Sequence, residues 1–147
     1  MFKKTSYSVP ADILAKAAVE INNARPAQLL NNPTGDKMRD PWNLADEFKG
    51  TVWEQILATI PVPLGEARLI KLSPKQCYQK HTDFDQKRYT LNINGLDSYL
   101  IDLTTLTMHE FINDGIWYTY DASIPHTAGN FGTTDRWQVI VIQLKEH

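Results

Sequence analysis

Residues 88–103 of this chain read RYTLNINGLDSYLIDL, two short runs rich in β-branched and aromatic residues with Asn94-Gly95 between them. Runs of this length and composition are typical of β-strands, and Asn-Gly is a common turn in a two-stranded hairpin. The stretch therefore predicts strands at Arg88–Asn94 and Asp97–Leu103, joined as an antiparallel hairpin.

Further strand-like runs lie on both sides of this hairpin. A second turn signal, Asn113-Asp114-Gly115, predicts another hairpin between two of them. Evenly spaced short strands with tight turns are typical of an antiparallel sandwich or barrel. We therefore expect residues 65–147 to form such a core, with additional strands at Ala67–Leu72, Leu106–Ile112, Ile116–Tyr120 and Trp137–Leu144.

The first 64 residues have a helical pattern instead. Apolar residues recur at helical spacing from Pro10 to Ala24, and proline suits the first turn of a helix. Asn43 is placed to cap a second helix from Leu44 to Phe48, and Thr51 to Ile60 continues that helix or forms a third. We expect a helical layer packed on the β core.

Length and composition predict one domain without a nucleic-acid or membrane partner. The chain has 147 residues, of which 42% are hydrophobic and 22% charged, and its net charge of -2 lacks the basic excess of a nucleic-acid binder. No apolar run approaches the roughly 20 residues that cross a bilayer. A single cysteine, Cys77, excludes an internal disulfide, and we expect a cytoplasmic protein. The oligomeric state stays open.

The residues that carry chemistry are His81, Asp83 and His126. An imidazole and a carboxylate two residues apart on an extended chain project to the same side, so His81 and Asp83 can bind one ion. His126 follows a predicted strand and adds a second imidazole. Two histidines and one carboxylate leave three metal positions open, as in non-haem Fe(II) oxygenases. The alternative is a surface loop whose histidine and aspartate are merely solvated.

Arg136 lies ten residues after His126, at the start of the last predicted strand. A guanidinium there can bind a carboxylate with two parallel hydrogen bonds, a geometry that lysine does not provide. The alternative is a surface salt bridge with Asp135 or Glu66.

Two segments resemble one family: residues 68–94, RLIKLSPKQCYQKHTDFDQKRYTLNIN, and residues 120–142, YDASIPHTAGNFGTTDRWQVIVI. They resemble the aspartyl/asparaginyl β-hydroxylases, which are Fe(II)- and 2-oxoglutarate-dependent oxygenases. The resemblance implies a mainly β fold with N-terminal helices, in which the core is a double-stranded β-helix, the cupin-like jelly roll. It also implies that Fe(II), 2-oxoglutarate and O2 take part in the reaction.

Specific residues acquire roles from this resemblance. His81 and His126 become iron ligands, and Arg136 binds the distal carboxylate of 2-oxoglutarate. Asp83 supplies the third ligand, which some members of the family lack. The resemblance also implies that polar side chains on the strand after the first ligand reach the co-substrate, here Arg88, Thr90 and Asn92, and the alternative is a solvent-facing strand edge. Tyr78, three residues before His81, resembles the YxxHxD spacing of prolyl hydroxylases, in which tyrosines near the metal contact 2-oxoglutarate; the alternative is a packed interior tyrosine. Asn130 either contacts the co-substrate or steadies its loop.

The implied activity is hydroxylation of an amino-acid carbon, either an Asp or Asn side chain in a protein or a free amino acid such as proline. Trp117 is a candidate wall of the substrate pocket. The loop from Ala24 to Trp42 carries Arg25 and Arg39, which are candidates to bind a substrate carboxylate. Two other functions remain: a cupin-like metal protein whose activity does not need 2-oxoglutarate, and a binding module without turnover.

Overall fold

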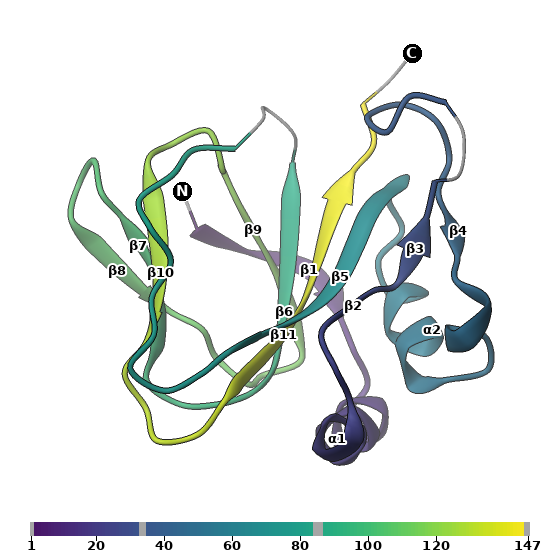
Figure 1. Ribbon diagram of the computed structural model, residues 1–147, viewed down its shortest axis with the longest axis horizontal. Coiled ribbons are helices and arrows are strands. Elements are labelled where there is room, and N and C mark those ends of the chain that lie inside the picture. The colour runs from purple at the N-terminus through teal and green to yellow at the C-terminus, as the bar shows by residue number, and fades with distance from the viewer. Residues whose placement is uncertain (1, 33–34, 84–86, 146–147) are drawn as a thin grey trace.

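Two antiparallel sheets face each other in the computed structural model, which describes residues 2–32, 35–83 and 87–145 (Figure 1). The larger sheet has the strand order β1 (Phe2–Ser8), β9 (Ile116–Tyr120), β6 (Arg88–Asn94), β11 (Arg136–Gln143), β5 (Leu64–Leu72) and β2 (Ala27–Gln28). The smaller sheet has the order β10 (His126–Asn130), β7 (Ser98–Asp102) and β8 (Thr107–Glu110). This arrangement confirms the predicted mainly β, jelly-roll fold.

The predicted turns occur, but they do not close hairpins. β6 and β7, on either side of Asn94-Gly95, belong to different sheets. The same holds for β8 and β9, on either side of residues 113–115. In a jelly roll such connections carry the chain from one sheet to the other, and a tight turn in the sequence does not distinguish the two uses. The hairpin prediction for these two turns is therefore wrong, whereas β7 and β8 do pair as neighbours.

The N-terminal half is less helical than its sequence pattern predicts. Its helices are α1 (Ala11–Glu20) and α2 (Val52–Leu57), with short 3-10 turns η1 (Ile21–Asn23) and η2 (Asp46–Phe48). It also contributes β1 and β2 to the large sheet. Asn43 does not cap a helix, because β4 (Asn43–Leu44) pairs with β3 (Leu30–Asn31). Within the described ranges, no helix is both long enough and apolar enough to cross a bilayer.

The large sheet has two chemically different faces. One face packs under α1 and α2 (Figure 1) and provides the main hydrophobic core, in which Leu69, Leu91 and Val139 are almost fully buried. The opposite face looks toward the small sheet, and the alternate residues of the same strands point there. Among them are several buried polar side chains, namely Arg88, Thr90, Arg136 and Gln138. The predicted chemistry therefore lies between the two sheets.

Candidate metal centre

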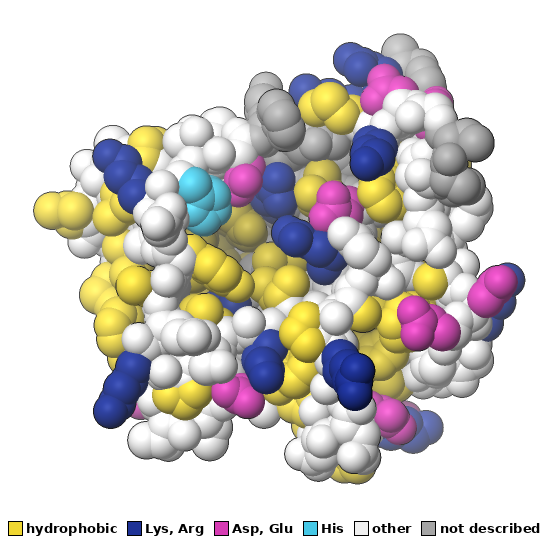
Figure 2. All heavy atoms as spheres, viewed as in Figure 1, with side chains coloured by type: hydrophobic (Ala, Val, Ile, Leu, Met, Phe, Trp, Pro, Cys, Tyr) yellow, Lys and Arg dark blue, Asp and Glu magenta, His cyan; other side chains and the backbone are white. Residues whose placement is uncertain are grey.

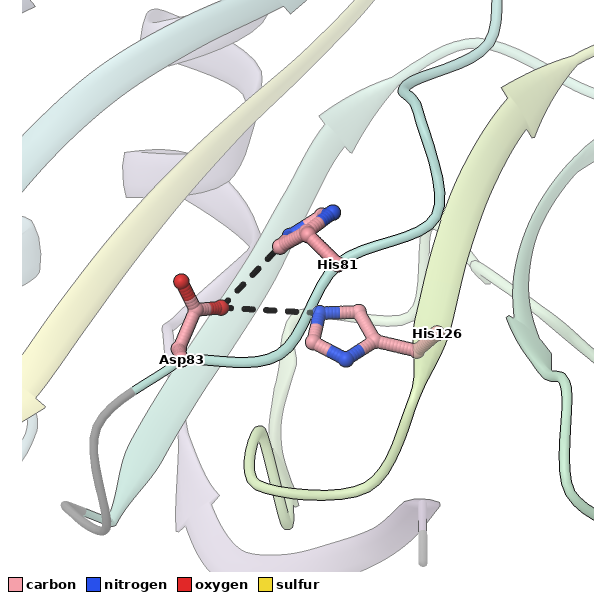
Figure 3. A group of neighbouring side chains, drawn as sticks. All are labelled: His81, Asp83 and His126. Carbon is pink, nitrogen blue, oxygen red and sulfur yellow. Dashed lines mark ion pairs between the residues drawn. The ribbon is translucent and has the colours of Figure 1, made fainter.

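The structure brings His81, Asp83 and His126 together (Figure 3). His126 is the first residue of β10, and His81 lies opposite it on the segment that follows β5. The two residues exchange both backbone hydrogen bonds, because His81 N–H donates to the His126 carbonyl at 3.1 Å and His126 N–H donates to the His81 carbonyl at 3.0 Å. Asp83 N–H donates to the Ala122 carbonyl at 2.8 Å. The backbone thus holds all three side chains in place.

Each histidine is oriented by its own backbone neighbour. Nδ1 of His81 lies 2.7 Å from the Gln79 carbonyl oxygen, and Nδ1 of His126 lies 2.7 Å from the Ile124 carbonyl oxygen. A carbonyl oxygen can only accept, so this arrangement favours the tautomer with the proton on Nδ1, in which the Nε2 lone pair can bind a metal ion. Carbonyl partners of this kind commonly orient histidines that bind metal ions.

The three candidate ligand atoms converge on one point. Oδ2 of Asp83 lies 3.5 Å from Nε2 of His81 and 3.6 Å from Nε2 of His126, and all three atoms lie within 4.8 Å of one another. Metal bonds of about 2 Å place neighbouring ligands roughly 3 Å apart, so the three side chains would move closer together to hold one ion. The donor set fits a divalent transition metal, with an open side for further ligands.

Arg88 contacts the other carboxylate oxygen of Asp83. Its Nη2 lies 3.8 Å from Oδ1, while both histidines approach Oδ2. The Arg88 side chain is buried on β6, so this attraction is weakly screened by solvent. The ion pair holds one oxygen of Asp83 and leaves the other directed to the metal position.

A cavity of about 200 Å³ lies next to the triad, between the two sheets. Figure 2 shows this side of the molecule, with basic side chains gathered around a hollow beside a histidine. Four residues predicted to contact the co-substrate line the cavity: Tyr78, Arg88, Thr90 and Arg136.

Arg136 lies in the buried part of this cavity, with 1% of its surface exposed. Its guanidinium lies 5.1 Å from the centre of the Phe111 ring. None of its three nitrogens has a hydrogen-bond partner of regular geometry among the described residues. Burial lowers the pKa of Arg136, and Tyr78 partly offsets that decrease. Because an unpaired buried cation is costly, this guanidinium is suited to receive an anion.

Other polar groups in the cavity also await partners. The Thr90 hydroxyl and Nε of Arg88 are buried without a hydrogen-bond partner among the described residues. Tyr120, on β9, lines the cavity with its ring 5.9 Å from that of His126. Burial raises the pKa of Tyr120, although the nearby Arg88 opposes this shift, so its phenol stays protonated and able to donate at neutral pH.

Two predicted contacts lie outside the cavity lining. Asn92 shares a face with Thr90, but its side chain bonds to Asn113 and to Gln138 farther along the sheet. Asn130 is buried, and its amide donates to the carbonyls of Leu72 and Thr134, each at 2.9 Å. Of the two roles expected for Asn130, these bonds match the one in which it steadies the connection after β10.

The three predicted substrate residues also lie elsewhere. Trp117 is fully buried in the core under the helices and donates from Nε1 to the Thr59 hydroxyl at 2.9 Å. Alternation along β9 explains this correction, since Tyr120 faces the cavity and Trp117 must face the other way. Arg39 pairs with Asp36 at 3.3 Å on the surface. Arg25 lines a separate groove beside α1, and residues 33 and 34 of the loop lie outside the described ranges.

Sequence reasoning missed three cavity residues with polar side chains: Arg68, Tyr120 and Gln138. A signal for Gln138 was present, because it lies two residues after Arg136 on one strand and therefore faces the same side. Arg68 carried no comparable signal, because its strand was recognised without any indication of which face looks toward the metal.

Comparisons with solved structures find the same fold in enzymes of low sequence identity. A prolyl-4-hydroxylase from Pseudomonas putida has 14% identity over 98% of this chain and 92% of its own, with a TM-score of 0.61. The viral collagen prolyl hydroxylase of Paramecium Bursaria Chlorella virus-1 has 12% identity over 99% and 96% of the two chains, with a TM-score of 0.58. A 2OG-Fe(II) oxygenase family oxidoreductase from Burkholderia pseudomallei has 8% identity over 94% and 81%, with a TM-score of 0.57.

No family model matches the sequence, and no curated protein matches it. The resemblance to aspartyl/asparaginyl β-hydroxylases in particular therefore stays a prediction. The comparisons show the fold that 2OG-Fe(II) oxygenases, including prolyl hydroxylases, share with this chain. Within that fold, the chain carries a His-X-Asp…His cluster with the geometry of a metal site.

Proposed function

We propose that this protein is an Fe(II)- and 2-oxoglutarate-dependent dioxygenase that hydroxylates an amino-acid carbon. The substrate class is an Asp or Asn side chain in a protein or a free amino acid such as proline. One observation carries the proposal: a buried arginine without a hydrogen bond of regular geometry among the described residues lies in the same cavity as a convergent two-histidine, one-carboxylate cluster. A metal ion and a dicarboxylate would together satisfy both features.

His81, Asp83 and His126 would hold the iron through Nε2, Oδ2 and Nε2. Iron with 2-oxoglutarate and O2 supplies oxidative decarboxylation to succinate and CO2, coupled to insertion of one oxygen atom into a C–H bond. The chain supplies orientation and shelter from water for this chemistry. A site with two histidines and one carboxylate suits this task because three coordination positions stay open.

Arg136 would bind the distal carboxylate of 2-oxoglutarate with two parallel hydrogen bonds. Because Arg136 is 1% exposed, such a pair lies in a medium of low dielectric constant and is weakly screened. The free Thr90 hydroxyl and the protonated Tyr120 phenol line the same cavity and can donate to the oxygens of a bound acid. Arg88 would hold Asp83 in register from the opposite oxygen.

The test is succinate release from 2-oxoglutarate by purified protein supplied with Fe(II), ascorbate and air. We expect succinate from the wild type, including slow turnover without substrate, and none from His81→Ala or Arg136→Ala. Arg25→Ala is the matched control, since it removes an arginine that lies outside the cavity. Iron binding without any 2-oxoglutarate binding would contradict the proposal and favour a cupin-like activity. Absence of metal binding would favour a binding module.

A further inference from the structure

Arg68 is a third basic group of the cavity lining, beside Arg88 and Arg136, and lies at the exposed edge. It projects from β5 with 44% of its side chain exposed, whereas Arg136 is 1% exposed. Ile140 of β11 pairs with Arg68 on one side and with Thr90 on the other, so the three residues form one row across the sheet. Arg68 is therefore close to the middle of the cavity along the sheet, and its side chain is accessible from solvent.

The guanidinium of Arg68 is fixed by one of its edges. Its Nε lies 2.9 Å from Oε1 of Glu66, and Nε2 of Gln28 donates to the same oxygen at 3.2 Å. Within the described ranges, this is the only ion pair of either residue, so the terminal nitrogens of Arg68 and Oε2 of Glu66 remain available. The guanidinium of Arg68 and the carboxylate of Glu66 thus hold each other in place, side by side at the rim of the cavity.

The charges of the cavity leave Arg68 without a task in the proposed reaction. Among the described residues, the cavity lining contains three guanidinium groups and one carboxylate, that of Asp83. Arg136 is assigned to the distal carboxylate of 2-oxoglutarate, and Arg88 contacts Asp83 at 3.8 Å. Arg68 pairs with Glu66 through Nε, and its terminal nitrogens have no ion pair among the described residues, so they can bind the carboxylate of a substrate.

Resting on the proposed function, we infer that the substrate is a free α-amino acid bound as a zwitterion. The terminal nitrogens of Arg68 bind its carboxylate, and Oε2 of Glu66 accepts from its ammonium group. Guanidinium recognises carboxylate through paired donors, so the orientation of the amino acid is defined by this edge. An internal residue of a protein has neither charged group on its backbone and cannot use this pair of contacts.

The test measures binding without turnover. Zn(II)-loaded protein with 2-oxoglutarate is titrated with each of the twenty free L-amino acids, and binding is detected by ligand-observed saturation-transfer NMR. We expect at least one amino acid to bind. Its carboxamide and its N-acetyl derivative should each bind about tenfold more weakly, because each loses one charge-assisted contact.

Two variants locate that binding on the chain. Arg68→Ala should weaken the bound amino acid about tenfold, and Glu66→Gln should weaken it while sparing its N-acetyl derivative. Lys71→Ala is the matched control, because Lys71 lies on the same strand but places its ammonium over the Trp137 ring, away from the cavity. Arg68 is substantially exposed, and circular dichroism verifies that each variant is folded.

The outcomes separate this inference from the proposed function. If 2-oxoglutarate binds to the Zn(II) protein but no free amino acid does, the inference is overturned and the oxygenase proposal stands. Equal binding of an amino acid and its carboxamide, or an unchanged affinity in Arg68→Ala, overturns it as well. If 2-oxoglutarate itself does not bind, the proposed function fails and the inference fails with it.

Discussion

The two faces of the six-stranded sheet come from the same strands but differ in the kind of side chain that they bury. On β6, Tyr89, Leu91 and Ile93 face the helices, while Arg88 and Thr90 face the small sheet. The helix side contains tightly buried apolar side chains. The cavity side buries guanidinium and hydroxyl groups, several of which have no partner among the described residues.

This difference separates stability from function within one element. Apolar burial contributes roughly 25 cal/mol per Å² to folding, so the helix side stabilises the chain. Burying a charge without a partner opposes folding, so the cavity side costs stability that only a bound anion can return. Substitutions on the helix side should therefore lower the free energy of unfolding and spare ligand binding. Substitutions of the unpaired groups on the cavity side should weaken ligand binding and spare or raise the free energy of unfolding.

The largest expected effect follows from removing a metal ligand. His126→Ala removes one of the three candidate ligand atoms, which lie within 4.8 Å of one another. It also removes the imidazole that the Ile124 carbonyl orients through Nδ1. We expect loss of stoichiometric Fe(II) binding and of all succinate formation, with the fold retained. Iron content by atomic absorption and circular dichroism check the two parts. His109→Ala, on β8, is the matched control, and iron retained by His126→Ala would contradict the assignment.

Arg136→Met should reverse the usual relation between burial and stability. Methionine fills a similar volume without placing an unpaired cation beside Phe111. We expect 2-oxoglutarate binding to weaken by roughly 2–5 kcal/mol, while the metal-free, co-substrate-free protein becomes more stable by roughly 1–4 kcal/mol. Calorimetric titration and urea unfolding measure these changes. A variant that loses stability and keeps its affinity for 2-oxoglutarate would show that Arg136 serves packing.

Leu91→Ala tests the other face of the same sheet. Leu91 is fully buried in the core under the helices, so the truncation leaves a cavity and should lower the free energy of unfolding by roughly 2–5 kcal/mol. Affinity for 2-oxoglutarate and metal should stay unchanged at temperatures where the variant is folded. Leu106→Ala, at a site 77% exposed, is the control and should have little effect. Weakened co-substrate binding in Leu91→Ala would mean that the faces are coupled.

The strands that could be predicted from the sequence are those with a clear local pattern of apolar residues and turns. Strands β6, β7 and β9 were predicted to within a residue of their observed ends, because their apolar content is dense and a turn bounds each of them. β1 was missed because its FKKTSYS sequence is polar and its side chains are mostly exposed. The assignment of each strand to a sheet was not predictable, because a turn such as Asn94-Gly95 looks alike in a hairpin and in a crossing between sheets.

The candidate site was predictable where a short spacing defines geometry. His81 and Asp83 are two residues apart on an extended segment, and the structure does place both beside His126. Residues chosen without that constraint, such as Trp117 and Arg39, lie away from the cavity because the sequence does not reveal which face or which loop borders it. Arg68 joins the site only through the pairing of β5 with β11, a long-range contact.

The smallest expected effect concerns a protonation on the cavity side of β9. Burial and the hydrogen bond from the Tyr118 hydroxyl to Asp114, at 2.7 Å, raise the pKa of Tyr118 to about 12. An unfolded tyrosine ionises near pH 10. Above that pH, ionisation lowers the free energy of the unfolded chain, while Tyr118 in the folded chain is still protonated. The contribution of Tyr118 to folding is therefore complete below about pH 10 and declines toward pH 12.

Tyr118→Phe should reduce the decrease of the unfolding free energy between pH 10 and pH 12, measured by urea denaturation. Tyr99→Phe is the matched control and should leave that decrease unchanged. Equal slopes in wild type and Tyr118→Phe would mean that the hydrogen bond to Asp114 is not maintained in solution.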